Sequence, residues 1–124
     1  MANSEGLHES EASLRPETVD RHRALTSLQE ELEAADWYDQ RVDASEDADL
    51  RAILAHNRDE EKEHAMMLLE WLRRHDPVLD SHMRTYLFTD GPITGIEART
   101  QGGEGMGTTG SGRDGSLGLG GARS

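Results

Sequence analysis

Apolar side chains recur at helical spacings through the middle of the chain. Pro16 and Glu17 are typical of a first helical turn. From there, apolar residues return at spacings of three, four, six and seven, which predicts an amphipathic helix to about residue 43. The apolar stripe of this helix consists of Val19, Leu25, Leu28, Leu32, Ala35 and Val42.

A polar turn, DASEDAD, separates this helix from a second one. Ser45 and Asp47 are suitable N-caps for a helix over about residues 46–75, and Pro77 marks its end. Beyond it, VLDSHMRTYLF predicts a shorter amphipathic helix, then a turn at Asp90-Gly91-Pro92 and a last short segment, ITGIEA. The apolar residues of the second helix are Leu50, Ile53, Leu54, Leu68, Trp71 and Leu72.

These elements predict an all-α fold. Two antiparallel helices of about 40 Å form a hairpin, and a short C-terminal helix follows. Two helices cannot enclose a core, because each stripe covers one side and a lone pair leaves apolar surface in water. The second helix also broadens at the consecutive apolar residues 65–69. We therefore expect two hairpins to dimerise into a four-helix bundle.

Composition limits the class of partner. The 124 residues carry a net charge of −12, which argues against nucleic acid or an anionic membrane and favours cations. The chain has no cysteine, so thiolate metal sites are excluded. No apolar run approaches the roughly 20 residues of a membrane span, and the N-terminus, MANSEGLHESEAS, is unlike a secretory signal. We expect a cytoplasmic protein.

The chain divides into three regions of different composition. Residues 1–15 are polar and are expected to be flexible, whereas residues 16–98 carry nearly all the apolar side chains. Residues 99–124 hold most of the glycines and few bulky side chains, so this tail is not expected to fold alone.

Three ionisable residues fall on the apolar sides of the two helices. Glu31 lies with Leu28 and Ala35 on the inner side of the first helix, and Glu61 and His64 form a Glu-x-x-His pair on the second. Burying such groups without partners is costly. Di-iron carboxylate bundles take a glutamate from each of two helices and a Glu-x-x-His pair from each of two others. One chain supplies half of that set, and two chains supply all of it.

The residue types suit iron chemistry. Carboxylate oxygen and imidazole nitrogen both bind iron(II), and four glutamates would neutralise two divalent ions. The alternative is a solvated ion pair of Glu61 and His64 with Lys62 or Arg58, because Glu-x-x-His occurs by chance on acidic helices. Tyr38 is either a core residue or a hydrogen-bond donor to a ligand.

Two further acidic sets are candidate cation sites. Glu30 and Glu33 lie beside Trp37 on a flank of the first helix, where they could pass iron inward. The second set is a ridge on the second helix. For both sets the alternative is an ordinary solvated face. The ridge consists of His56, Glu60 and Glu63.

The tail contains GSLGLGG, in which Leu117 and Leu119 alternate with glycine. The alternative to a disordered end is a docking peptide on a flexible tether, whose two leucines enter pockets of a partner. Such a tether suggests that the folded part is cargo.

Long stretches of the chain resemble the encapsulated ferritins of bacteria and archaea. These are EELEAADWYDQR, ILAHNRDEEKEHAMMLLEWLRR and RTYLFTDGPITGIEA. The resemblance implies a ferritin-like bundle in a ring-shaped homodecamer, with a di-iron ferroxidase centre between subunits. It implies that Glu31, Glu61 and His64 are the ferroxidase ligands and that Tyr38 lies beside them. It also implies that Glu30, Glu33 and Trp37 take up metal and that His56, Glu60 and Glu63 bind outer cations, with calcium a candidate at either place.

The tail is similar to the signal that loads such proteins into an encapsulin shell. The targeting peptide is expected at about residues 115–123. In the familiar form, Leu-Gly-Ile-Gly-Ser-Leu-Arg, isoleucine stands where this chain has Leu119, and a final leucine stands where it has Ala122. The loss of that last apolar anchor is expected to weaken docking.

The hypothesis from the sequence is a ferroxidase that oxidises iron(II) with oxygen and supplies iron(III) for mineral storage in an encapsulin nanocompartment. One rival is a rubrerythrin-like peroxidase or manganese catalase, which would use the same ligands and turn over hydrogen peroxide. The other is a non-enzymatic acidic adaptor whose glutamates bind calcium.

Overall fold

The computed structural model describes residues 6–102, and all the regular secondary structure in that range is helical. A short 3-10 helix, η1 (Glu11–Ser13), precedes helix α1 (Pro16–Ala44), which is followed by α2 (Ala48–Arg74). Two shorter helices complete it, α3 (Pro77–Tyr86) and α4 (Ile93–Gly102). The predicted all-α hairpin is confirmed. The ITGIEA segment begins a helix that continues past residue 98, where the helical region was expected to end.

Local sequence explains where the two long helices begin and end. Pro16 occupies the first turn of α1, where its missing N–H costs nothing. Asp47 caps α2, because its side chain accepts a hydrogen bond of 2.8 Å from the Leu50 N–H. Arg73 and Arg74 lie in the last turn of α2, where positive charge complements the helix dipole. Of the two predicted caps, Asp47 is the one used.

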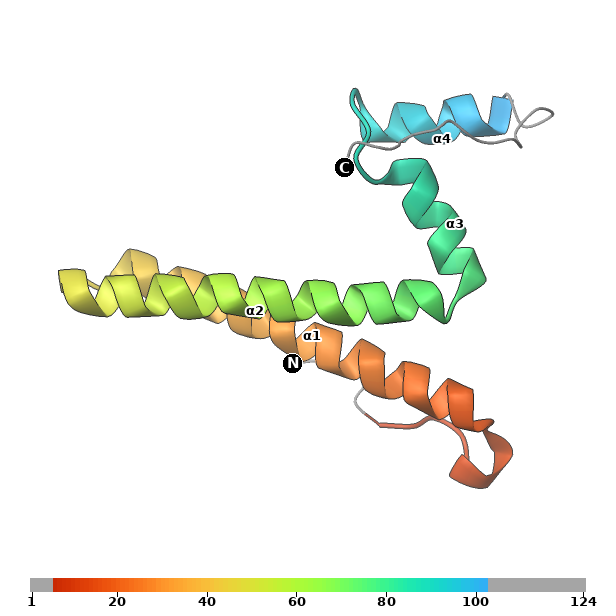
Figure 1. The fold of residues 1–124 in the computed structure, drawn as a ribbon, viewed down its shortest axis with the longest axis horizontal. Helices are drawn as coiled ribbons and strands as arrows, with labels where there is room; N and C mark the ends of the chain where they lie inside the picture. The colour runs from red at the N-terminus through yellow and green to blue at the C-terminus, as the bar shows by residue number, and fades with distance from the viewer. Residues whose placement is uncertain (1–5, 103–124) are drawn as a thin grey trace. The chain divides into compact units, whose positions relative to one another are not determined.

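Helices α1 and α2 pack against each other as an antiparallel hairpin (Figure 1). Small side chains make this approach possible, because Ala24, Ala35 and Ala65 are all buried and Ala65 is fully so. Larger apolar residues complete the thin core of the hairpin. They are Val19, Val42 and Leu72.

Several residues of the predicted apolar stripes lie outside this core. Leu25 and Leu32 of α1 are 46% and 50% exposed, so a single chain does not cover the stripe predicted for this helix. On α2, Ile53 is 57% exposed and Met67 is 59% exposed. The small alanines occupy the contact between the helices, and the longer side chains fall to either side of it. The single hairpin therefore leaves apolar surface exposed to water, as the sequence predicts for two helices alone.

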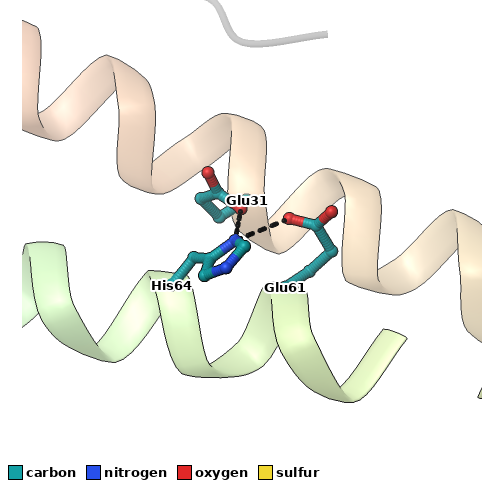
Figure 2. A group of neighbouring side chains, drawn as sticks. All are labelled: Glu31, Glu61 and His64. Carbon is teal, nitrogen blue, oxygen red and sulfur yellow. Dashed lines mark ion pairs between the residues drawn. The ribbon is translucent and has the colours of Figure 1, made fainter. Parts of the chain in front are cut away.

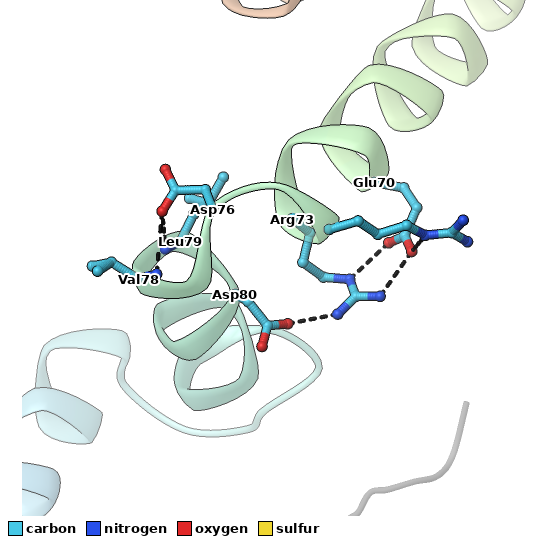
Figure 3. A network of polar contacts seen from close by, with 7 residues as sticks. Glu70, Arg73, Asp76, Val78, Leu79 and Asp80 are labelled. Carbon is cyan, nitrogen blue, oxygen red and sulfur yellow. Dashed lines mark hydrogen bonds and ion pairs between the residues drawn. The ribbon is translucent and has the colours of Figure 1, made fainter. Parts of the chain in front are cut away.

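The corner between α2 and α3 is held by charged hydrogen bonds (Figure 3). Arg73 donates two bonds of 2.8 Å to Glu70 on its own helix and one of 2.6 Å to Asp80 on α3. Arg74 donates to the same Glu70 carboxylate at 2.7 Å. Asp76 caps α3 by accepting from the Val78 and Leu79 N–H groups. This network stops α2 and starts α3 within a few residues.

The described chain divides into two compact units after Asp80. The first contains the hairpin and all the predicted metal ligands. In the second, Ile96 of α4 is buried. None of the described helices is both long enough and apolar enough to span a membrane.

Candidate metal centre

The hairpin brings Glu31, Glu61 and His64 together (Figure 2). Glu31 comes from α1, while Glu61 and His64 stand one turn apart on α2, so both face the same side of that helix. The Nδ1 of His64 lies 3.4 Å from Glu31 Oε1 and 3.5 Å from Glu61 Oε1. One ligand atom from each of the three residues lies within 4.8 Å of the others. Within residues 6–102, no other trio of histidine or carboxylate side chains gathers its ligand atoms this closely.

The three side chains are partly buried. Glu31 and Glu61 are 26% and 24% exposed, and His64 is 45% exposed. Neighbouring carboxylates disfavour each other's negative charge. Hydrogen bonding with the Glu61 carboxyl, together with burial, raises the pKa of Glu31, and His64 opposes that rise. For His64, desolvation lowers the pKa, but the negative charges of Glu31 and Glu61 outweigh it and the pKa is raised.

One atom of the cluster is left without a hydrogen bond. Glu31 Oε1 is buried and makes no hydrogen bond with any described residue, since the His64 contact at 3.4 Å is an ion pair without hydrogen-bond geometry. A buried carboxylate oxygen without a donor is costly unless something else satisfies it. A divalent cation among two carboxylates and an imidazole would do so, and these are ligands that iron(II) accepts. The residues present therefore fit a metal centre.

The alternative drawn from the sequence involved Arg58 or Lys62. The Arg58 guanidinium donates to Asp39 on α1 and to Asp59 on its own helix, both at 3.0 Å. Lys62 is exposed to solvent. Arg58, which shares the Glu61 side of α2, is thus bound to two other carboxylates. No local pattern in the sequence indicates the Arg58–Asp39 pair, because the two residues stand on different helices.

The remaining predicted site residues are not gathered in this way. Tyr38 is half-buried, and Arg41 lies over its ring at 5.2 Å. In the predicted uptake set, Trp37 is 50% exposed, Glu30 is exposed and Glu33 is half-buried.

The predicted outer set lies on the exposed face of α2. The Nε2 of His56 lies 3.1 Å from Glu60, and both side chains are largely exposed. Glu63 is exposed as well. On this ridge His56 and Glu60 form a surface ion pair, and the Glu63 carboxylate lies on the same exposed face.

Comparison with known proteins identifies the family. The EncFtn-like family model matches residues 6–90, which covers both long helices and all three clustered ligands. The chain belongs to the EncFtn-like family.

An encapsulated ferritin-like protein of Rhodospirillum rubrum is 62% identical over 124 residues, covering 95% of this chain and 88% of the relative. A ferritin-like protein of Thermotoga maritima is 58% identical over 96 residues, covering 77% of this chain and 84% of the relative. An encapsulin nanocompartment cargo protein of Myxococcus xanthus is 38% identical over 58 residues, covering 47% of this chain and 45% of the relative.

The fold also matches a crystal structure of a protein from Nitrosomonas europaea. The TM-score is 0.68 and the identity is 61%, over 71% of this chain and 97% of the other. The resemblance to encapsulated ferritins noted in the sequence is therefore confirmed. In this chain the hairpin brings together a cluster of two carboxylates and one imidazole.

Proposed function

We propose that this protein is a ferroxidase whose di-iron centre is completed by two chains. The observation that carries the proposal is the buried Oε1 of Glu31, which has no hydrogen-bond donor and lies beside Glu61 and His64. One chain supplies two carboxylates and one imidazole, which is half the set used by di-iron carboxylate bundles. The exposed apolar surface beside the hairpin supports pairing with a second copy. The names of two relatives, which describe ferritin-like proteins, point in the same direction.

In this proposal iron is the substrate. Glu31 and Glu61 bind and orient iron(II) through carboxylate oxygens, and their negative charge offsets that of the cation. His64 binds through a ring nitrogen, which requires the neutral imidazole, so metal uptake releases the proton that the two glutamates favour on His64. Each iron(II) gives one electron to oxygen and leaves as iron(III). Tyr38, on the same helix as Glu31, is proposed to donate a hydrogen bond to a ligand.

The outer acidic residues are proposed as cation sites of lower affinity. Glu30 and Glu33 beside Trp37 would attract iron(II) from solution, and the exposure of Glu30 and Trp37 suits rapid exchange. The His56 and Glu60 pair with Glu63 would hold a divalent ion at the surface, and calcium, which prefers carboxylate oxygen, is a candidate for either place.

The test compares oxygen consumption after addition of anaerobic iron(II) to the wild type and to Glu31→Ala at equal chain concentration. We expect the variant to fall to the rate of buffer alone, because Glu31 is the sole ligand that α1 contributes. Glu46→Ala, which removes an exposed acidic residue at the turn between α1 and α2, is the matched control and should retain the wild-type rate. Equal rates for the wild type and Glu31→Ala would refute the proposal. Turnover of hydrogen peroxide well above iron oxidation would instead favour the peroxidase class.

We also propose that the protein is cargo of an encapsulin shell, in which its iron(III) mineralises. Two relatives carry names that describe encapsulated or encapsulin cargo proteins. A two-helix chain has no closed cage of its own, so storage has to come from a partner. The assembly would be a ring of dimers, expected as a decamer, in a cytoplasmic compartment.

The proposed targeting peptide at residues 115–123 lies outside the described residues. Its test is co-expression of an encapsulin with the full chain or with a chain truncated after residue 112. We expect truncation to abolish loading, and a Leu117→Ser and Leu119→Ser double variant of the full chain to do the same. Cargo retained in the shell without these residues would contradict the role.

A further inference from the structure

A charged residue stands one turn before the metal cluster on α2. Arg58 and Glu61 are related by i and i+3, so their side chains lie on neighbouring parts of the helix surface. An arginine in that position is within reach of a glutamate carboxylate and would form an ion pair with it. Such a pair would occupy the oxygens that Glu61 offers to a cation.

The structure gives this arginine two other partners. The Nη1 of Arg58 lies 3.0 Å from Asp39 Oδ1 on α1, and its Nε lies 3.0 Å from Asp59 Oδ1 on α2. The Arg58 side chain is only 23% exposed, so it packs along the hairpin rather than extending into solvent. Asp39 and Asp59 are more than half exposed, and each binds a different nitrogen of the guanidinium.

The bond to Asp39 also crosses between helices. It forms only when α1 and α2 are packed, which is the same condition that brings Glu31 to His64. In an isolated α2, Arg58 would keep only its local carboxylates, of which Glu61 is one. Packing of the hairpin therefore assembles the metal ligands and at the same time binds a cation that could compete for Glu61.

We infer that Asp39 and Asp59 hold Arg58 away from Glu61 and so keep the Glu61 carboxylate available to a divalent cation. The inference rests on the proposed metal site and deepens it, because it names residues that touch no metal. Asp39 and Asp59 act as positioning residues through Arg58. They contribute to the affinity of the centre for metal, and this contribution disappears when the arginine is removed.

The test measures the dissociation constant of cobalt(II), a redox-stable probe, by titration calorimetry and by its visible absorption. The Asp39→Asn and Asp59→Asn double variant frees Arg58, and we expect its dissociation constant to rise about threefold to tenfold. Adding Arg58→Gln to that double variant should restore binding to the wild-type value. A purely structural role for these residues predicts that the triple variant binds as poorly as the double one, or worse.

The matched control is the Asp43→Asn and Asp49→Asn double variant. It removes the same charge from exposed positions on α1 and α2 and leaves Arg58 with both partners. If the freed variant unfolds by circular dichroism, the single Arg58→Gln variant decides the matter. It should bind cobalt(II) at least as tightly as the wild type, and weaker binding would overturn the inference.

The remaining outcomes separate this inference from the function on which it rests. Cobalt(II) binding that depends on Glu31 but does not change when Arg58 is freed overturns the inference and leaves the ferroxidase proposal standing. Equal weakening in the Asp43 and Asp49 control means that only overall charge matters, which also overturns it. A wild type without any Glu31-dependent binding overturns both.

Discussion

Glu31 Oε1 on α1 lies 3.4 Å from His64 Nδ1 on α2, although the two residues are on opposite arms of the hairpin. This is the contact that turns a common pair, Glu61 and His64, into a three-ligand cluster. It sits where the helices approach through small side chains, with Ala35 and Ala65 buried nearby in sequence on the same two helices. The metal ligands and the packing of the hairpin are therefore parts of one arrangement.

Activity is expected to require association of two chains. Ile53 is 57% exposed in a single chain, and an arginine there would place a charge in the apolar surface between hairpins. We expect Ile53→Arg to yield monomers on size exclusion and to lose catalytic iron oxidation, because each chain holds half of the ligands. A monomeric fraction with full activity per chain would show that the site is not shared.

The metal-free protein is expected to lose stability as the pH rises. The pKa of Glu31 in the folded protein lies above its ordinary value of 4.5, so the folded protein holds this proton more tightly than the unfolded chain. The stability linked to this proton is complete below about pH 4.5 and is lost as the pH passes through the raised pKa. His64, whose pKa is raised from 6.5, acts with the same sign at higher pH.

Glu31→Gln tests this dependence because it removes the titrating carboxyl and keeps its shape. With a chelator present, we expect the melting temperature of the variant to exceed that of the wild type near pH 7. The difference should shrink toward pH 4.5. A constant difference across this range would mean that Glu31 titrates normally. The same variant should lose iron oxidation, so stability and function are expected to change in opposite directions.

The corner between α2 and α3 should respond to pH with the opposite sign. Hydrogen bonds from Arg73 and Arg74 lower the pKa of Glu70 from 4.5 to about 2. The stability that this carboxylate contributes is therefore present above about pH 4.5 and is lost as the pH falls toward 2. The test measures the free energy of unfolding as a function of pH. Glu70→Gln should weaken its fall between about pH 4.5 and pH 2, while Glu46→Gln leaves that fall unchanged. If Glu70→Gln shows the same pH dependence of unfolding as the wild type, solvent screens the network.

Leu72 is the largest fully buried side chain of the described residues, at 2% exposure. Leu72→Ala should lower the free energy of unfolding by about 2–5 kcal/mol, through lost transfer energy and the cavity left behind. Ile93→Ala, at a position that is 70% exposed, should change it by less than about 1 kcal/mol. Urea denaturation at a fixed chain concentration measures both, and equal effects would mean that the hairpin core does not limit stability.

Much of the site follows from local pattern. Glu61 and His64 share a face because one turn of an α-helix separates them, and this holds wherever the helix packs. The bounds of α1 and α2 follow from Pro16, from the Asp47 cap and from the proline after α2, each of which acts on its own neighbours. The quoted stretches also carried the family resemblance, which the comparison with known proteins confirms.

The rotation and register of one helix against the other were decided only by the tertiary structure. Periodicity placed Leu32 beside Glu31 on the inner side, yet Leu32 is half exposed and Glu31 faces His64. The reason is that an apolar stripe is wider than the line of contact, and the line falls where alanines allow the closest approach. Asp39 meets Arg58 for the same reason, since a contact between separate helices depends on how they pack and leaves no local periodic signal.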